Sequence, residues 1–283
     1  MFPTPIERAS PPVQILYKAA LPIALLVWLA PIIAVALTSI RGQADLTSGN
    51  YWGLPTQWKI AENYAAVFTN TPILHYIGNS FLVTIPTVIG AVALSCLAGF
   101  ALGIYRFRFN LLVFFIFVGG NFVPFQILMV PVRDLSLKLG LYDTVTGLVL
   151  FHVAFQTGFC TFFMRNFIRE LPSELIDAAR VEGASEFQIF WRVVLPLVRP
   201  AVAALAVLIF TFIWNDYFWA TVLIQGDHAM PVTGGLKTLN GQWVAQWQLV
   251  SAGSIGAALP PVVIFFLMQK HFIAGLTMGA TKG

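Results

Sequence analysis

Long uncharged apolar stretches constrain this chain more than any other feature of its sequence. Six such stretches occur, and the only charged residue inside them is Asp216. About 20 apolar residues are enough for one helix to cross a bilayer core. We therefore predict an all-α integral membrane protein, a single transmembrane domain over residues 1–283, with six transmembrane helices at Ala19–Ile40, Tyr76–Tyr105, Phe109–Val132, Thr144–Met164, Ala201–Ile224 and Leu249–Gln269.

The composition excludes a soluble fold. Charged residues make up only 10% of the chain and hydrophobic residues 58%, whereas soluble domains average about 25% charged residues. The net charge of +4 is small and scattered, so no nucleic-acid partner is expected. Cys96 and Cys160 both lie in apolar stretches, where cysteines are usually buried thiols rather than a disulfide or a metal site.

The distribution of Lys and Arg predicts the orientation in the membrane. If both termini are cytoplasmic, eleven Lys and Arg residues lie on the cytoplasmic side and five on the other. Cytoplasmic loops carry an excess of these residues, so we predict a multi-pass protein with both termini in the cytoplasm. The N-terminal residues lack the apolar core and cleavage site of a secretory signal, so we expect the first span to remain as an anchor.

The longest predicted cytoplasmic loop, residues 165–199, has the pattern of two short helices. Ser173 and Glu174 after Pro172 predict a helix start with a capping hydroxyl. Gly183 is expected to break this helix, and a second helix is predicted over 184–194 before Pro196. An apolar helical pair outside the lipid is a surface that expects a partner.

This loop carries a recognisable motif. Asp177-Ala178-Ala179, then three residues, Gly183, nine residues and Val193-Val194-Leu195-Pro196 resembles the EAA motif of bacterial ABC importer permeases. Asp177 stands in place of Glu and Val193 in place of Ile. Glu182 occupies the position before the glycine, which is usually Asp in the subfamily.

The resemblance implies a type I ABC importer permease fold with a coupling helix that enters a cleft of a cytoplasmic ATPase subunit. Asp177 would pair with a basic residue of that ATPase, and Gly183 would form the turn. An i,i+3 pair of Asp177 with Arg180 is a compatible alternative worth about 0.2–0.5 kcal/mol. The implied coupling residues are Glu174, Asp177, Ala178, Ala179, Glu182, Gly183, Leu195 and Pro196.

The C-terminal tail, residues 270–283, resembles that of carbohydrate permeases similar to the smaller membrane subunit of the maltose transporter. There the tail reaches between the ATPase subunits. Its glycines are compatible with a thin extended strand, and a frayed terminus is the alternative. The implied contacts are Gly275, Thr277, Gly279 and Lys282.

A third resemblance is the Trp-Asn-acidic segment in the fifth span, with Asn79-Ser80 at the start of the second. Intramembrane polar residues are costly unless they face a cavity or one another. For the fifth-span residues, capping or cross-linking of helices and membership of an aromatic belt are equally open roles. For Asn121 and Gln126 in the third span, we favour close helix packing around the nearby Pro and Gly over a cavity lining. The candidates for the substrate path are Trp214, Asn215, Asp216, Tyr217, Asn121 and Gln126.

Two further features are less specific. His152 is a single histidine inside the fourth span, and we favour a structural role over a proton relay because no ionisable group is evident beside it. The third outer loop is rich in turn residues and tryptophan. By resemblance it reaches towards an extracytoplasmic sugar-binding protein through Gly235, Leu236, Asn240, Gly241 and Trp243.

The chain has no phosphate-binding loop of the Gly-x-x-x-x-Gly-Lys-Ser/Thr type. We therefore expect no enzyme activity and no cofactor in this chain, with ATP and Mg²⁺ bound by a partner ATPase. The resemblance implies a sugar-importer permease of the bacterial inner membrane, with two ATPase subunits, a second homologous permease and a binding protein as partners. A self-sufficient secondary transporter, and a membrane enzyme that uses His152 and Asp216, are the alternatives.

Overall fold

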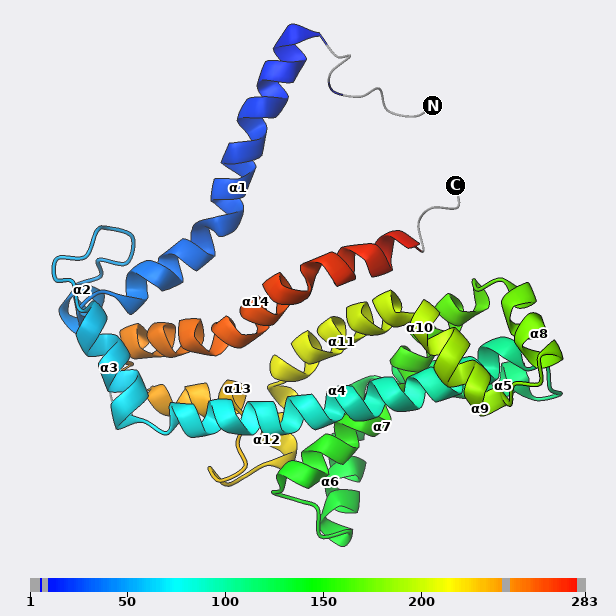
Figure 1. The fold of residues 1–283 in the computed structure, drawn as a ribbon. Helices are drawn as coiled ribbons and strands as arrows, with labels where there is room; N and C mark the ends of the chain where they lie inside the picture. The colour runs from blue at the N-terminus through cyan, green and yellow to red at the C-terminus, as the bar shows by residue number, and fades with distance from the viewer. Residues whose placement is uncertain (1–5, 7–9, 241–244, 279–283) are drawn as a thin grey trace. The chain divides into compact units, whose positions relative to one another are not determined.

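The fold is helical throughout the part of the chain that the structure describes. This computed structural model describes residue 6 and residues 10–240 and 245–278 (Figure 1). Within those residues the only β pairing is an isolated bridge between Arg41 and Trp58. The predicted all-α class is confirmed. The chain forms two compact units, one of residues 1–71 with 238–256 and the other of residues 72–237 with 257–283.

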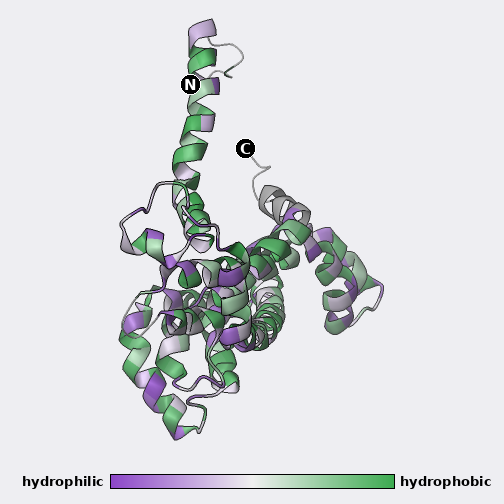
Figure 2. Ribbon diagram, turned by 90° about the vertical axis from the view of Figure 1, so that its left-hand side faces the viewer, coloured by the Kyte–Doolittle hydropathy of each residue, from purple (hydrophilic) through white to green (hydrophobic). Residues whose placement is uncertain are grey.

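The first unit begins with an apolar helix whose side chains are almost all exposed. Helix α1 (Pro11–Ser39) buries only Ser39, and Figure 2 shows its apolar residues in green along its length. Such a helix is stable only when lipid or another protein covers it. The unit also contains α2 (Gln43–Thr47), α3 (Ile60–Asn70) and the first turns of α14 (Trp247–Met278).

The chain after α1 is held by a buried arginine. Arg41 is fully buried, and its guanidinium donates hydrogen bonds to the carbonyls of Asn50 and Gly53, the latter at 3.0 Å. Asn63 of α3 donates to the carbonyls of Ser39 and Arg41, both at 2.9 Å. Because buried polar groups are costly unless they are bonded, these contacts give the segment one conformation.

The second unit is built around α4, which packs along α7 and α11. Gly99 and Gly103 allow the backbones of α4 and α7 to approach closely, since a Cβ on Gly99 would lie 2.9 Å from the backbone nitrogen of Arg165. The helices of this unit are α4 (Ile73–Ile104), α5 (Asn110–Gly119), η2 (Gly120–Phe122), η3 (Phe125–Leu128), α6 (Met129–Lys138), α7 (Val145–Arg169), α8 (Ser173–Val181), α9 (Glu186–Ile189), the π-helical turn η4 (Phe190–Val194), α10 (Leu195–Leu197), α11 (Arg199–Trp214), α12 (Phe218–Leu223) and α13 (Val232–Gly235), followed by η5 (Leu236–Leu239) at the boundary with the first unit.

Two predicted spans are broken rather than straight. Four described helices are long and apolar enough to cross a membrane, or up to six if each bent pair is one span. The third predicted span bends by 89° between residues 122 and 125, because Pro124 has no backbone N–H to donate a helical hydrogen bond. The fifth predicted span ends as a helix at Trp214 and restarts at Phe218. The prediction of one continuous helix over residues 201–224 was therefore wrong.

Candidate functional site

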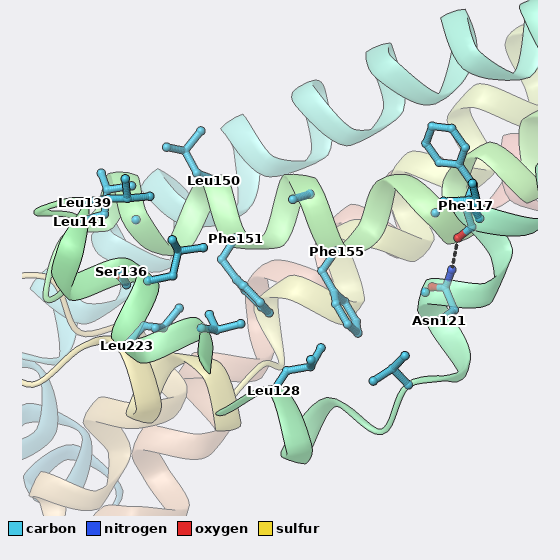
Figure 3. A pocket seen from close by; sticks show the side chains of 18 residues that line it. Phe117, Asn121, Leu128, Ser136, Leu139, Leu141, Leu150, Phe151, Phe155 and Leu223 are labelled. Carbon is cyan, nitrogen blue, oxygen red and sulfur yellow. Dashed lines mark hydrogen bonds between the residues drawn. The ribbon is translucent and has the colours of Figure 1, made fainter. Parts of the chain in front are cut away.

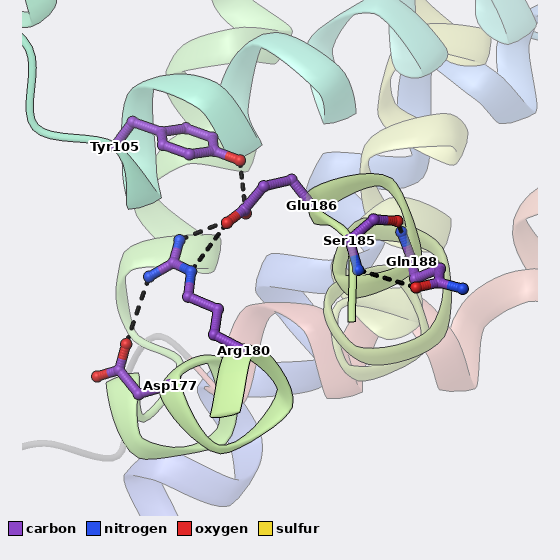
Figure 4. Close-up of polar contacts among 6 residues, drawn as sticks. All are labelled: Tyr105, Asp177, Arg180, Ser185, Glu186 and Gln188. Atoms are coloured by element: carbon purple, nitrogen blue, oxygen red, sulfur yellow. Dashed lines mark hydrogen bonds and ion pairs between the residues drawn. The ribbon is translucent and has the colours of Figure 1, made fainter. Parts of the chain in front are cut away.

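The segment that carries the sequence motif forms a helical hairpin, α8 and α9. Gly183 has φ of +80°, a left-handed conformation that favours glycine, so its predicted role as the turn is confirmed. Ser185 then begins α9 through a capping box with Gln188: Gln188 N donates to Ser185 Oγ at 3.3 Å, and Ser185 N donates to Gln188 Oε1 at 2.8 Å (Figure 4). The predicted cap at Ser173 is wrong, because Pro172 is the N-cap and Ser173 already lies in the helix.

Arg180 connects the two arms of the hairpin and the end of α4 (Figure 4). Its Nε and Nη2 donate to the two carboxylate oxygens of Glu186 at 2.9 and 3.3 Å. Its Nη1 lies 3.3 Å from Asp177 Oδ1, which confirms the predicted i,i+3 pair. Tyr105, which follows α4, donates its hydroxyl to Glu186 at 2.5 Å. These contacts raise the pKa of Arg180, chiefly through its hydrogen bond to Glu186.

The predicted coupling residues divide into an exposed group and an internal group. Glu174, Asp177 and Ala178 are exposed on α8, with the side chain of Asp177 66% exposed. Exposed apolar side chains lie beside them on the same hairpin, including Val181 at 89% and Phe187 at 70%. Glu182 caps the end of α8, whereas Ala179, Leu195 and Pro196 are half-buried. The hairpin thus presents a surface of mixed acidic and apolar character.

Replacing Tyr105 with Phe should loosen the hairpin. The substitution removes one hydrogen bond to a carboxylate, a contribution of about 1.5–3 kcal/mol, without changing the ring. We expect faster amide hydrogen exchange over residues 173–190 in the purified protein. Tyr142→Phe is the control, because that ring contacts Arg133 by a cation–π interaction. Equal exchange in the two variants would show that Tyr105 does not hold the hairpin.

Asp143 anchors the chain that follows α12. Its Oδ1 accepts hydrogen bonds from the amides of Gln225 at 2.7 Å and Gly226 at 2.8 Å, and its carbonyl lies 3.0 Å from His228 Nε2. Burial would raise the pKa of Asp143, but the hydrogen bonds from the backbone amides of Gly226 and Gln225 outweigh this effect and hold the pKa below the usual 3.8. The segment after α12 is therefore attached to the residue two positions before α7.

The start of α4 holds the same segment from the other side. Asn79 Nδ2 donates to the carbonyls of His228 and Met230 at 3.0 and 3.1 Å. Ser80 Oγ accepts from the amide of Val232 at 2.8 Å. Gly235 packs so closely on the ring of Tyr76 that a Cβ would overlap it. The Asn79-Ser80 pair noted in the sequence thus positions residues 228–232, and Tyr76 packs against Gly235.

Asp143 gives this attachment a defined pH dependence. A carboxylate with a lowered pKa stabilises the folded protein above the unfolded pKa and loses that contribution as pH falls through the folded value. Asp143→Asn keeps the accepting oxygen but not the charge, so we expect it to cost about 1 kcal/mol at neutral pH. Melting temperatures measured from pH 7 to pH 3 should converge for the two proteins. A constant difference across that range would contradict this role.

Asp216 lies at the break in the fifth span and caps the helix that follows. Its carboxylate accepts from the amides of Trp219 at 3.3 Å and Ala220 at 2.9 Å, the first turn of α12. Its Oδ2 also lies 3.5 Å from Nε2 of His152 on α7, with the two side chains 16% and 4% exposed. The expectation that His152 has no ionisable neighbour was therefore wrong. The contact brings two ionisable side chains together, although neither ring nitrogen of His152 forms a hydrogen bond with the described residues.

The substrate-path candidates around the break face different environments. Trp214 is 2% exposed, donates Nε1 to the carbonyl of Ala257 at 2.9 Å and stacks on Phe210. Asn215 is exposed, with Nδ2 bonded to the Thr211 carbonyl at 2.8 Å. Tyr217 is 53% exposed. Asn215 and Tyr217 are therefore accessible in this chain, and Trp214 is a packing residue.

A cavity of about 670 Å³ lies between the bent third span and α7 (Figure 3). Asn121 lines it with its amide turned to the Phe117 carbonyl at 3.1 Å, whereas Gln126 is exposed and outside it. Its remaining lining is almost entirely apolar, and includes Leu128, Leu150, Phe151 and Phe155. Sugar hydroxyls need polar partners, so this cavity alone does not suit a sugar.

The other predicted contacts fall partly outside the described residues. Gly235 is buried, Leu236 is half-buried and Asn240 is exposed, whereas Gly241 and Trp243 lie outside the described residues. Gly275 and Thr277 belong to α14, which continues to Met278 where an extended tail was expected. Gly279 and Lys282 lie outside the described residues. The contacts that sequence reasoning missed, Tyr105–Glu186 and Asp143–Gly226, left no local pattern.

Comparison with known proteins finds permease proteins that match most of this chain. The chain is 34% identical over 251 residues to the Probable ABC transporter permease protein PH1036 of Pyrococcus horikoshii, covering 88% of this chain and 91% of that protein. It is 32% identical over 255 residues to the Arabinooligosaccharides transport system permease protein AraQ of Halalkalibacterium halodurans, covering 89% and 91%.

A solved structure has the same fold over nearly the whole chain. A chain of the bacterial ABC transporter involved in the import of the acidic polysaccharide alginate superposes with a TM-score of 0.81 at 25% identity, covering 96% of this chain and 99% of that chain. Residues 81–278, more than half of the sequence, match a single family model. The chain belongs to the family of binding-protein-dependent transport system inner membrane components.

Proposed function

We propose that this chain is the permease subunit of an ATP-driven importer of a sugar or sugar derivative, and that it forms half of the translocation pathway. The observation that carries the proposal is the α8–α9 hairpin, whose exposed carboxylate and apolar side chains are held in one orientation by Arg180 and Tyr105. A surface of that kind is suited to dock on another protein.

The proposed partners follow from the family and from the hairpin. Two ATPase subunits bind ATP and Mg²⁺, an extracytoplasmic binding protein delivers the solute, and a second homologous permease completes the pathway. The bilayer is the inner membrane, with both termini in the cytoplasm. The excess of Lys and Arg on the termini's side supports this orientation.

A sugar is the favoured solute class because the AraQ relative is named for arabinooligosaccharides and the similar structure belongs to an alginate importer. Within this chain, the break between α11 and α12 offers groups that suit a sugar. Asn215 and Tyr217 are exposed there, and an amide and an aromatic ring match sugar hydroxyls and C–H faces. Asp216 is occupied as a helix cap, so we assign it a supporting role.

The experiment is transport by the co-purified complex in proteoliposomes. Radiolabelled mono- and oligosaccharides are supplied with the binding protein outside and ATP inside. We expect uptake that requires ATP and stops with vanadate. Uptake by this chain alone, driven by an ion gradient without ATP, would favour a secondary transporter instead.

A further inference from the structure

A second cavity, of about 790 Å³, lies at the hairpin end of the second unit. It is bounded by the turn between α4 and α5, the last turns of α7 and one side of α8 from Ser173 to Arg180. Its lining carries one carboxylate, Asp177, and five arginines, which we call the arginine pocket: Arg106, Arg108, Arg165, Arg169 and Arg180.

Most of this positive charge is not neutralised within the described part of the chain. Arg180 is paired with Asp177 and Glu186. Arg108 lies over the ring of Phe109, with its guanidinium carbon 5.4 Å from the ring centroid. Arg106, Arg165 and Arg169 form no ion pair with the described residues. The pocket therefore has an excess of cations that an anion would relieve.

Arg165 points its charge into this pocket from a buried position. Only 8% of the residue is exposed, its Nε donates to the Leu102 carbonyl at 3.2 Å, and its guanidinium carbon lies 3.9 Å from the ring centroid of Phe114. Its two terminal amino groups remain available. Arg169 follows one helical turn later, where like charges repel. Buried charges are normally paired, and no carboxylate among the described residues pairs with Arg165, which points to an external anion.

The surroundings of the pocket favour a lipid over a free ion. Asn110 holds the α4–α5 turn by donating to the carbonyls of Leu102 and Tyr105 at 3.1 and 2.9 Å. Exposed apolar side chains flank the arginines, namely Phe107 (45%), Phe109 (56%) and Leu111 (59%). Basic pockets between transmembrane helices at the cytoplasmic surface are suited to phospholipid head groups. A molecule with a phosphate and an acyl chain matches both parts.

We propose that the arginine pocket binds the phosphate group of an anionic phospholipid, with its acyl chains along Phe109 and Leu111. This site goes beyond the transport function, and only its assignment to the cytoplasmic leaflet rests on the orientation proposed above. Because Asp177 of α8 belongs both to the wall of this pocket and to the coupling surface, a bound lipid would lie next to that surface.

The test measures lipid binding without ATP or sugar, so its outcome is independent of the transport proposal. The intact transporter is purified, delipidated and incubated with phosphatidylglycerol or phosphatidylcholine, and bound lipid is counted by native mass spectrometry. We expect a preference for phosphatidylglycerol that falls about tenfold or more in Arg106→Gln/Arg169→Gln, because each substitution removes a charge-assisted hydrogen bond. Both residues are exposed, so the fold should tolerate their loss.

Arg192→Gln/Arg199→Gln is the matched control, since both arginines are exposed and lie outside the pocket. Equal phosphatidylglycerol binding in the pocket variant and the wild type would overturn the proposal. An equal loss in the control would also overturn it, because the preference would then reflect general surface charge. Inorganic phosphate is added as a competitor, and its displacing the lipid at equal phosphate concentration would identify the ligand as the free anion instead.

Discussion

Asp177→Arg should abolish ATP-driven uptake while the protein still inserts into the membrane. The Asp177 side chain is 66% exposed, and its contact with Arg180 is at 3.3 Å, so an exposed pair of this kind contributes about 0–1 kcal/mol to folding. At a docked interface the same carboxylate matters far more. Loss of one partner of a buried charge pair costs about 2–5 kcal/mol, which lowers the affinity of the interface about thirtyfold or more. Reversal of the charge at residue 177 adds repulsion.

Uptake into proteoliposomes and ATPase activity stimulated by the binding protein measure this effect. Glu62→Arg is the matched control. Glu62 is 61% exposed and forms an i,i+3 pair with Lys59 at the start of α3, away from α8 in the sequence. We expect near wild-type uptake from Glu62→Arg and from the conservative Asp177→Glu. Wild-type uptake by Asp177→Arg would exclude the docking role of α8.

The features that sequence reasoning located correctly depend on neighbouring residues. The hairpin could be predicted because its motif extends over about twenty residues, and Gly183 because a left-handed turn favours glycine. The pair of Asp177 and Arg180 follows from helical spacing alone. The cap was misplaced by one residue because both Pro172 and Ser173 suit a helix start, and Pro172 took the N-cap position.

Contacts between distant parts of the chain could not be predicted in this way. His152 and Asp216 come from different spans and meet only because the fifth span breaks after Trp214. Tyr105 reaches Glu186 across 81 residues. Neither pair leaves a periodic pattern, and both depend on how the helices pack. The accessible groups at the break, Asn215 and Tyr217, could be proposed from the sequence, but their separation from the buried Trp214 required the structure.

The close contact of α4 with α7 was also missed, although Gly99 and Gly103 show the small-xxx-small spacing of packed transmembrane helices.

A bulky side chain at the contact between α4 and α7 is predicted to have a large effect on stability. In Gly99→Val the new Cβ would lie 2.9 Å from Arg165 N and 3.0 Å from Met164 Cβ. Because the nearest atom belongs to helix backbone, it cannot move as a flexible side chain does. We expect a loss of stability at or above the upper end of the usual 1–3 kcal/mol for overpacking.

Gly78 provides the control on the same helix, because a Cβ there meets no atom within 4 Å. Gly78→Val adds the same side chain to α4 and should leave stability within about 0.5 kcal/mol, the usual range at exposed positions. Thermal unfolding of the two purified variants in one detergent compares them directly. Equal melting temperatures would mean that α4 and α7 separate without cost. A large loss confined to Gly99→Val would show that the contact between α4 and α7 supports the second unit. The position of Arg165 depends on the same contact, because a Cβ at Gly99 would meet the backbone of Arg165 and the side chain of Met164.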